Sequence, residues 1–248
     1  MTAPVFVVDH LDAGGGGDGR RVLSGPEGRH AVSVKRLRTG ERVVLTDGAG
    51  RWAEAEVLGT EGKDRLLLRL GEVAEEPAES PRITVVQALP KGDRGELAVE
   101  TMTEVGVDAI VPWTAARCIT QWKGERGLKA LGKWRATARE AGKQSRRVRF
   151  PDVADAATTK QVAALLADAD FAAVLHESGE EPLATAELPA SGHLVLVVGP
   201  EGGVSPEELA LFAAAGAPAY RLGRSVLRTS TAGTAAAALL LGRSGRWS

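Results

Sequence analysis

The sequence has a single cysteine, Cys118, among its 248 residues. An internal disulfide is therefore excluded, and so is a zinc site built from several cysteines. Histidine is scarce as well, and the four histidines lack the spacing of metal ligands: His10, His30, His176 and His193. We therefore expect no metal cofactor.

Long apolar runs are absent too, because no segment reaches the roughly 18 to 20 residues that span a bilayer. The first residues carry neither a basic stretch nor the long apolar segment of a signal peptide. We expect a cytoplasmic protein with no membrane partner. Hydrophobic residues make up 44% of the chain, so a globular protein of one large or two moderate domains is expected.

The chain has almost no net charge, with a formal value of -1 at pH 7. Positive charge nevertheless gathers in two stretches, with a net charge of +6 over residues 133–149 and +4 over residues 28–42. Solvated helix faces or surface ion pairs also produce such runs. Two of them in a nearly neutral chain favour binding to a polyanion.

The hydrophobic pattern divides the chain into three parts. Residues 1–72 contain short alternating runs separated by Gly- and Asp-rich turns, which predicts a small antiparallel barrel. Residues 73–81 are acidic, contain two prolines and predict a linker. Residues 82–248 alternate strand and helix, the rhythm of a parallel sheet in an α/β domain. The low-complexity stretch at 14–19 is expected to be a loop without a chemical role.

Several elements of the C-terminal part are predicted individually. A helix is expected over 94–105 and should end at Gly106, and further helices are expected over 131–145 and 230–242. Apolar runs predict buried strands over 83–89, 108–113, 171–176 and 193–199.

A glycine-rich turn, GPEGG at 199–203, follows one of these strands and precedes a helix. Ser205 suits the N-cap of that helix, Pro206 its first position, and Glu208 the position that completes a capping box. Glycine-rich turns often bind phosphate, but this one has no lysine and carries Glu201, so like charges would repel an anion. It suits a neutral or cationic ligand with a flat ring, although a plain tight turn would look the same.

Two other loops resemble binding segments. In residues 222–228, Val226 and Leu227 are costly to expose, so they either cover a ring such as adenine or fill the core. Residues 175–177 end a strand, where open α/β sheets bind ligands. His176 lies there, but a lone histidine is more often structural than catalytic.

These loops, taken in order, resemble the SPOUT superfamily of S-adenosylmethionine-dependent RNA methyltransferases. The bacterial family that methylates N3 of a uridine in the 16S RNA of the small ribosomal subunit is the best match. The resemblance covers nearly the whole chain. It rests on five segments: RHAVSVKRLRTGERV, ALPKGDRGELAVETMTEVGVDAIVPWTAAR, WRATAREAGKQSRRVRFP, VVGPEGGVSPEE and LGRSVLRTSTA.

The resemblance implies a PUA-like barrel that binds RNA, followed by an α/β domain with a deep trefoil knot. It also implies a homodimer with the active site at the subunit interface. The family places S-adenosylmethionine (SAM) against the knotted loops, and these residues are expected to bind it: Leu175, His176, Glu177, Val198, Gly199, Pro200, Glu201, Gly202, Leu222, Gly223, Ser225, Val226 and Leu227.

The RNA is expected to bind basic residues of both parts: Arg29, His30, Lys35, Arg36, Arg38, Lys91, Arg139, Lys143 and Arg147. Arg228 is the candidate catalytic residue, since a cation could stabilise negative charge on the uracil oxygens. The family usually has a glutamate where this chain has Ser230, which is expected to cap the last helix instead. Arg29 and His30 stand where two histidines are common. Methylation of transfer RNA or of a ribose hydroxyl, and a non-catalytic rRNA-binding module, remain alternatives.

Overall fold

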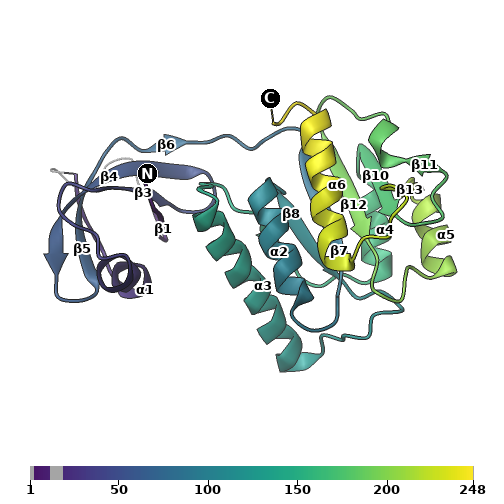
Figure 1. The fold of residues 1–248 in the computed structure, drawn as a ribbon, viewed down its shortest axis with the longest axis horizontal. Helices are drawn as coiled ribbons and strands as arrows, with labels where there is room; N and C mark the ends of the chain where they lie inside the picture. The colour runs from purple at the N-terminus through teal and green to yellow at the C-terminus, as the bar shows by residue number, and fades with distance from the viewer. Residues whose placement is uncertain (1–2, 12–18, 248) are drawn as a thin grey trace. The chain divides into compact units, whose positions relative to one another are not determined.

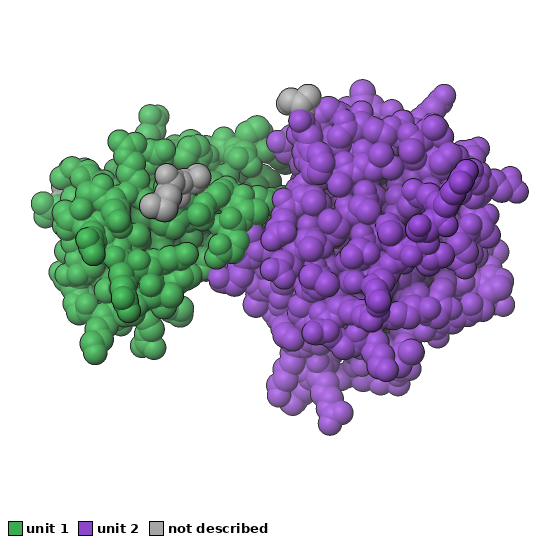
Figure 2. Space-filling view, in the orientation of Figure 1, with its two compact units in different colours: residues 1–78, 142–150 green, residues 79–141, 151–248 purple. Residues whose placement is uncertain are grey.

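The computed structural model describes residues 3–11 and 19–247. It divides into two compact units, coloured separately in Figure 2. Unit 1 comprises residues 1–78 and 142–150, and unit 2 comprises residues 79–141 and 151–248. The stretch at 14–19 lies outside the described residues except for Gly19.

Unit 1 is built on a six-stranded sheet, whose path runs β1-β3-β4-β5-β2 with β6 paired to β4. Figure 1 labels β1, β3, β4, β5 and β6. The strands are β1 (Val5–Val7), β2 (Arg20–Leu23), β3 (Arg42–Thr46), β4 (Arg51–Glu61), β5 (Arg65–Leu70) and β6 (Ala74–Glu75). The expected antiparallel pairing is confirmed throughout except that β1 lies parallel to β3. A short helix, α1 (Gly25–Arg29), continues into a π-helical turn at His30–Val34.

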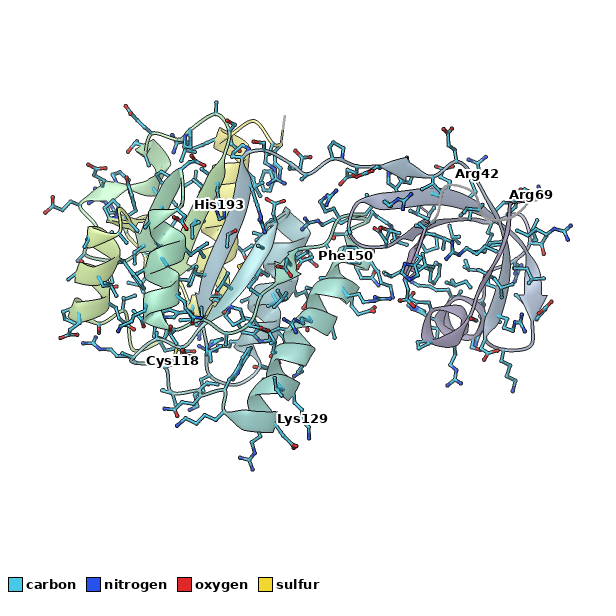
Figure 3. The ribbon with its side chains drawn as sticks, turned by 180° about the vertical axis from the view of Figure 1, so that it is seen from behind. Arg42, Arg69, Cys118, Lys129, Phe150 and His193 are labelled. Atoms are coloured by element: carbon cyan, nitrogen blue, oxygen red, sulfur yellow. The ribbon has the colours of Figure 1, made fainter. Side chains whose placement is uncertain are left out.

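Alternating side chains of these strands form the core of unit 1, which includes Phe6, Leu45, Val57 and Leu68. The outward positions carry charge, and exposed ion pairs join neighbouring strands, with Arg42 bonded to Glu54 and Arg69 to Glu56. Figure 3 shows both arginines projecting from the strands. Such exposed pairs each contribute about 0 to 1 kcal/mol, so the apolar face provides most of the stabilisation.

Residues 142–150 complete unit 1 although they lie far along the chain. The N–H of Phe150 donates to the carbonyl of Gly48 at 2.8 Å. The Phe150 ring packs so closely on Gly48 and Gly142 that a Cβ there would lie 2.8 and 2.3 Å from it. Lys143 is 4% exposed and forms an ion pair with Glu27, with Nζ and Oε1 2.9 Å apart. Both close packing and a buried ion pair attach this segment to unit 1.

Unit 2 contains a seven-stranded parallel sheet in the order β11-β13-β10-β12-β7-β8-β9. The strands are β7 (Arg82–Ala88), β8 (Ala109–Trp113), β9 (Asp152–Val153), β10 (Phe171–Leu175), β11 (Glu181–Pro182), β12 (His193–Val198) and β13 (Ala219–Arg221). The helices are α2 (Arg94–Val105), α3 (Gly124–Gln144), α4 (Thr159–Ala167), α5 (Pro206–Ala214) and α6 (Thr229–Arg243), with a 3-10 turn at Leu183–Thr185. The predicted α/β domain with a parallel sheet is confirmed.

Helices cover both faces of this sheet (Figure 1). On one face, residues of α2, α3 and α6 such as Met102, Trp134 and Leu240 join a core with the strands. On the other face, Val162 of α4 and Phe212 of α5 form a second core. Both faces of the sheet are thus shielded from water, as expected for a parallel sheet. None of the helices in the described parts of the chain combines the length and apolar character needed to cross a bilayer.

Helix ends follow the sequence in two of three cases. Helix α2 ends at Gly106, whose φ of 109° favours glycine, and Ser205 and Glu208 form the predicted capping box of α5. The expected cap of α6 was wrong, because Arg228 occupies the cap position. The chain stays extended through Arg228, so Ser230 falls in the first helical turn and is buried.

His193, at the start of β12, is expected to make the stability of the folded protein depend on pH. Figure 3 labels this residue on the sheet. Its Nε2 lies 2.7 Å from Oγ1 of Thr84, and burial, together with the charge of Arg82, lowers the pKa of His193 below its usual 6.5. His193 therefore binds a proton more readily in the unfolded chain than in the folded protein. The folded state is stabilised at pH values above the ordinary histidine pKa, and this stabilisation is lost as the pH falls. We expect urea unfolding of His193→Gln to depend less on pH between about pH 7.5 and about pH 5 than the unchanged protein. An equally steep pH dependence in both proteins would contradict this assignment.

Candidate functional site

A cavity of about 530 Å³ lies at the carboxyl ends of β10, β12 and β13. Parallel strands end at one edge of a sheet, so the loops that follow them meet there. The three loops singled out in the sequence all line this cavity: residues 175–177, 198–204 and 221–229. All thirteen residues predicted to bind the cofactor are among its lining residues, and so is Arg228.

The sequence interpretation assigned no binding role to eight other lining residues, although Gly203 and Arg224 lie in the loops it singled out. The eight are Arg94, Arg117, Gly203, Val204, Arg221, Arg224, Thr229 and Ala232. Arg94 begins α2, and Arg117 lies in the loop after β8. Both follow the carboxyl end of a strand of the same parallel sheet. Their position after a strand end could have identified them in the sequence, since the loops after parallel strands converge on one edge of the sheet.

The glycine-rich turn at 199–203 is held by hydrogen bonds from three separate parts of the chain. The N–H of Lys91 donates to Oε1 of Glu201 at 3.1 Å, and Nη1 of Arg117 donates to the carbonyl of Gly202 at 3.3 Å. Oγ1 of Thr229 donates to the carbonyl of Gly199 at 2.8 Å. The turn is therefore fixed in place before any ligand binds.

Thr229 is in turn fixed by Gln87, the last but one residue of β7. Nε2 of Gln87 donates to Oγ1 of Thr229 at 3.0 Å, and the Gln87 side chain is fully buried. The start of α6, the end of β7 and the glycine-rich turn are thus joined by one chain of hydrogen bonds. Among the described residues the Gln87 Oε1 has no hydrogen-bond partner, so the link to Thr229 runs through Nε2 alone.

Glu208 connects the base of the same turn to two other elements. Its Oε1 accepts hydrogen bonds from the N–H of Ala116 at 2.8 Å and from Oγ1 of Thr159 at 3.0 Å. Its Oε2 accepts from the N–H of Ser205 at 3.1 Å. The side chain is buried, so this carboxylate serves the fold and not a ligand.

Glu208→Ala is expected to destabilise the protein by about 3 kcal/mol, because three donors lose a charged acceptor and the N–H of Ser205 among them is buried. The neighbouring Glu207→Ala is the matched control, since Glu207 occupies the same helical turn but is exposed. Its loss should destabilise the protein far less than the loss of Glu208. Urea unfolding of the two variants measures the difference, and equal losses would argue against this role of Glu208.

The loop between β13 and α6 gives the cavity an apolar wall. Val226 is 82% exposed and Leu227 is 40% exposed, while Leu222 and Leu175 are half-buried. Covering exposed apolar side chains with a ligand lowers the free energy of the complex and so favours binding. Together with the side-chain-free backbone of the glycine-rich turn, they suit the faces of a flat ring.

His176 is engaged within its own loop. Its Nδ1 lies 2.7 Å from Oγ of Ser178 and accepts a hydrogen bond from the Ser178 N–H at 3.2 Å. The ring therefore shapes the turn after β10. The structural role of a lone histidine, weighed in the sequence, agrees with this geometry.

Metal and thiol chemistry find no support in the described residues. No group of three or more His, Cys, Asp or Glu side chains there could hold a metal ion. Cys118 is half-buried, and burial raises the pKa of its thiol above the ordinary value, which favours the protonated, unreactive form.

The residues predicted to bind RNA differ in exposure. Arg29, Lys35, Arg36 and Arg38 are exposed on or just after the helical segment of unit 1, and His30 there is half-buried. Lys91 is exposed beside the glycine-rich turn. Arg139 and Arg147 are half-buried, whereas Lys143 is buried in its ion pair with Glu27. Lys143 is therefore left out of the proposals below.

Two family models match the chain. A model described as an RNA methyltransferase domain matches residues 78–241, and one described as an RNA methyltransferase PUA domain matches residues 23–71. The first match alone covers more than half of the chain.

Curated relatives carry the name ribosomal RNA small subunit methyltransferase E. The protein from Mycobacterium bovis is 44% identical over 251 aligned residues, which cover 100% of this chain and 94% of the relative. The protein from Bacillus subtilis is 29% identical and covers 85% of each chain.

Solved structures agree with these matches. A methyltransferase from Legionella pneumophila, in complex with SAM, superposes with a TM-score of 0.86 at 27% identity, covering 98% of both chains. Ribosomal RNA small subunit methyltransferase E from Neisseria gonorrhoeae, bound to S-adenosyl methionine, gives a TM-score of 0.83 at 30% identity and the same coverage. The chain therefore belongs to the family of RNA methyltransferases that includes the proteins named ribosomal RNA small subunit methyltransferase E.

Proposed function

We propose that this protein transfers a methyl group from SAM to N3 of a uridine in 16S ribosomal RNA of the small ribosomal subunit. One observation carries the proposal, the meeting of all three predicted loops in a single cavity at the carboxyl edge of the parallel sheet. The structures of two relatives with SAM, and the names of the curated relatives, support the cofactor and the substrate.

The cavity suits SAM in size and in chemistry. Its volume of about 530 Å³ lies within the range of small-molecule sites, about 300 to 1,000 Å³. Val226 and Leu227 offer apolar contact for the adenine ring, and the backbone of 199–203 allows close approach. The carboxylates of Glu177 and Glu201 suit the positively charged groups of the cofactor. When bound, SAM supplies an electrophilic methyl group on a sulfonium.

The chain must help the uracil ring to lose its N3 proton. As the proton leaves, negative charge spreads over N3 and the flanking carbonyl oxygens, and a cation close to these oxygens would stabilise it. Arg228 lines the cavity, and its side chain makes no hydrogen bond or ion pair with any residue the structure describes. We assign Arg228 this role. A uridine buried in folded RNA must be turned out of its stack to reach the cavity.

Phosphate contacts are expected to supply much of the RNA affinity, and affinity should fall steeply with salt. The exposed basic residues of unit 1, Arg29, Lys35, Arg36 and Arg38, are the proposed contacts there. On unit 2, Lys91 is exposed at the glycine-rich turn.

We also propose that the protein acts as a homodimer in the cytoplasm. The exposed Val226 and Leu227 beside the cavity support a covering surface from a second subunit.

Two measurements test the proposed function. SAM at about 100 times its Kd should stabilise the folded protein by about 2.7 kcal/mol, which raises the melting temperature. Small ribosomal subunits incubated with the protein and SAM should then carry one new methyl group, which mass mapping of nucleosides places on N3 of uridine. A methyl group on transfer RNA or on a ribose hydroxyl would reassign the substrate. The absence of any melting shift would overturn the enzymatic assignment.

A further inference from the structure

The cavity has more arginines in its lining than SAM has negatively charged groups to pair with them. Its lining includes two glutamates, Glu177 and Glu201, and five arginines: Arg94, Arg117, Arg221, Arg224 and Arg228. SAM brings a sulfonium, an ammonium and a single carboxylate. At most one guanidinium can therefore pair with the single carboxylate of the cofactor.

Two of the arginines are engaged by the protein itself. Nη1 of Arg221 donates to the carbonyls of Gly179 at 3.3 Å and Glu180 at 2.7 Å. Arg117 donates to the carbonyl of Gly202. These side chains hold the loops around the cavity.

Arg94 and Arg224 differ from this pair. Neither side chain makes a hydrogen bond or an ion pair with another residue in the described part of the chain. Arg94 is half-buried, whereas Arg224 is exposed in the loop before α6. The two carboxylates that line the cavity, Glu177 and Glu201, are the ones proposed above to face the positively charged groups of SAM. The two guanidinium groups thus line the cavity with their donors available to an anion.

The two arginines come from distant parts of the sequence and line the same cavity only because of the fold. Arg94 begins α2 after the first strand of unit 2, and Arg224 follows the last strand, β13. A guanidinium offers a planar set of donors that matches phosphate oxygens. A nucleotide whose base enters the cavity carries a phosphate on each side of its ribose.

We propose that Arg94 and Arg224 form a phosphate-binding site that holds the RNA backbone next to the target nucleotide. The assignment rests on the proposed function, in which RNA is the substrate of this cavity. It adds two positioning residues from unit 2 to the basic residues of unit 1, and it separates backbone contacts from Arg228, which faces the reacting base.

The salt dependence of RNA binding tests the site. A fluorescently labelled, uridine-containing single-stranded RNA of about ten nucleotides is titrated with the full-length protein at several salt concentrations. Each phosphate contact on a single strand contributes about 0.7 to the slope of log K against log salt. Arg94→Gln and Arg224→Gln should each lower the slope by about 0.7, and the double variant by about 1.4.

The controls separate this site from the cofactor site and from the fold. Arg94→Lys keeps the charge and should retain the slope. Arg82→Gln removes an exposed arginine at the amino end of β7, the opposite edge of the sheet, and should leave the slope unchanged. The Kd for SAM, measured by calorimetry, should be the same in all variants.

The outcomes are distinct. Unchanged slopes in Arg94→Gln and Arg224→Gln would overturn the phosphate site, even if the protein methylates RNA. Loss of SAM affinity with unchanged slopes would assign these arginines to the cofactor instead. Lower slopes in a protein that transfers no methyl group would support the phosphate site and contradict the proposed function.

Discussion

Gly202→Val is expected to weaken SAM binding about 100-fold, because displacing the glycine-rich turn loses about 2 to 3 kcal/mol. A Cβ at position 202 would lie 3.1 Å from the carbonyl oxygen of Arg117 and 3.2 Å from its Cβ. A branched side chain cannot fit there unless the turn moves away from Arg117. That movement breaks the Arg117 bond to Gly202 and shifts Glu201, which is held by Lys91.

Thermal melting with and without SAM measures this effect. The turn is at the surface, so Gly202→Val should melt close to the unchanged protein without SAM. SAM at about 100 times the original Kd should then stabilise it by only about 0.4 kcal/mol, in place of about 2.7 kcal/mol. Gly132→Val is the matched control, because Gly132 is exposed on α3 and a Cβ there meets no atom within 4 Å. A variant at 202 that still binds SAM with the original Kd would refute the placement of the cofactor against this turn.

Arg228→Ala is expected to lower the rate of methyl transfer by about 100- to 1,000-fold, as the loss of one charge-stabilising donor does in other active sites. The guanidinium lines the cavity, but it only stabilises charge that develops during the reaction. SAM affinity should therefore stay nearly constant while kcat falls. The backbone carbonyl of Arg228 accepts from the N–H groups of Thr231 and Ala232, and this contact survives the substitution.

Single-turnover methylation of small ribosomal subunits at saturating protein gives the rate directly. Arg228→Lys retains a cation without the planar donor set and should recover part of the rate. Raising the pH should partly rescue Arg228→Ala, since the imide then loses its proton without help. If kcat is unchanged and only the apparent affinity for RNA falls, Arg228 is a phosphate contact and not a catalytic residue.

Sequence patterns predicted correctly those helices and strands whose ends and buried faces depend on residues close together in the chain. The capping residues of α5 and the glycine at the end of α2 are examples, because both depend only on a few neighbouring positions. Helix α3 begins at Gly124, well before the expected start at residue 131, because Gly124 and Gly127 have a low helix propensity that hides this first part of the helix in the sequence. Helix α4 went unpredicted although Thr158 and Gln161 form a capping box.

The site was predictable to the extent that it lies on three loops whose sequence is unusual. The hydrogen bonds that fix those loops were not predictable, because Gln87 bonds to Thr229 and Glu208 bonds to Ala116, and these partners are far apart in sequence. Arg94 and Arg224 are likewise ordinary surface arginines until the fold places them on one cavity. The trefoil knot stays a prediction, since no local pattern encodes how a chain threads through itself.

The return of residues 142–150 to unit 1 has a consequence for how the protein can be divided. The chain passes from one unit to the other after residue 78, again after 141 and again after 150, so neither unit is one continuous piece of polypeptide. A fragment that stops at the end of β6 would lack the Phe150 ring that packs on Gly48. It would also lack Lys143, whose ammonium pairs with Glu27. Unit 1 produced on its own therefore needs residues 142–150 joined back to it by a linker.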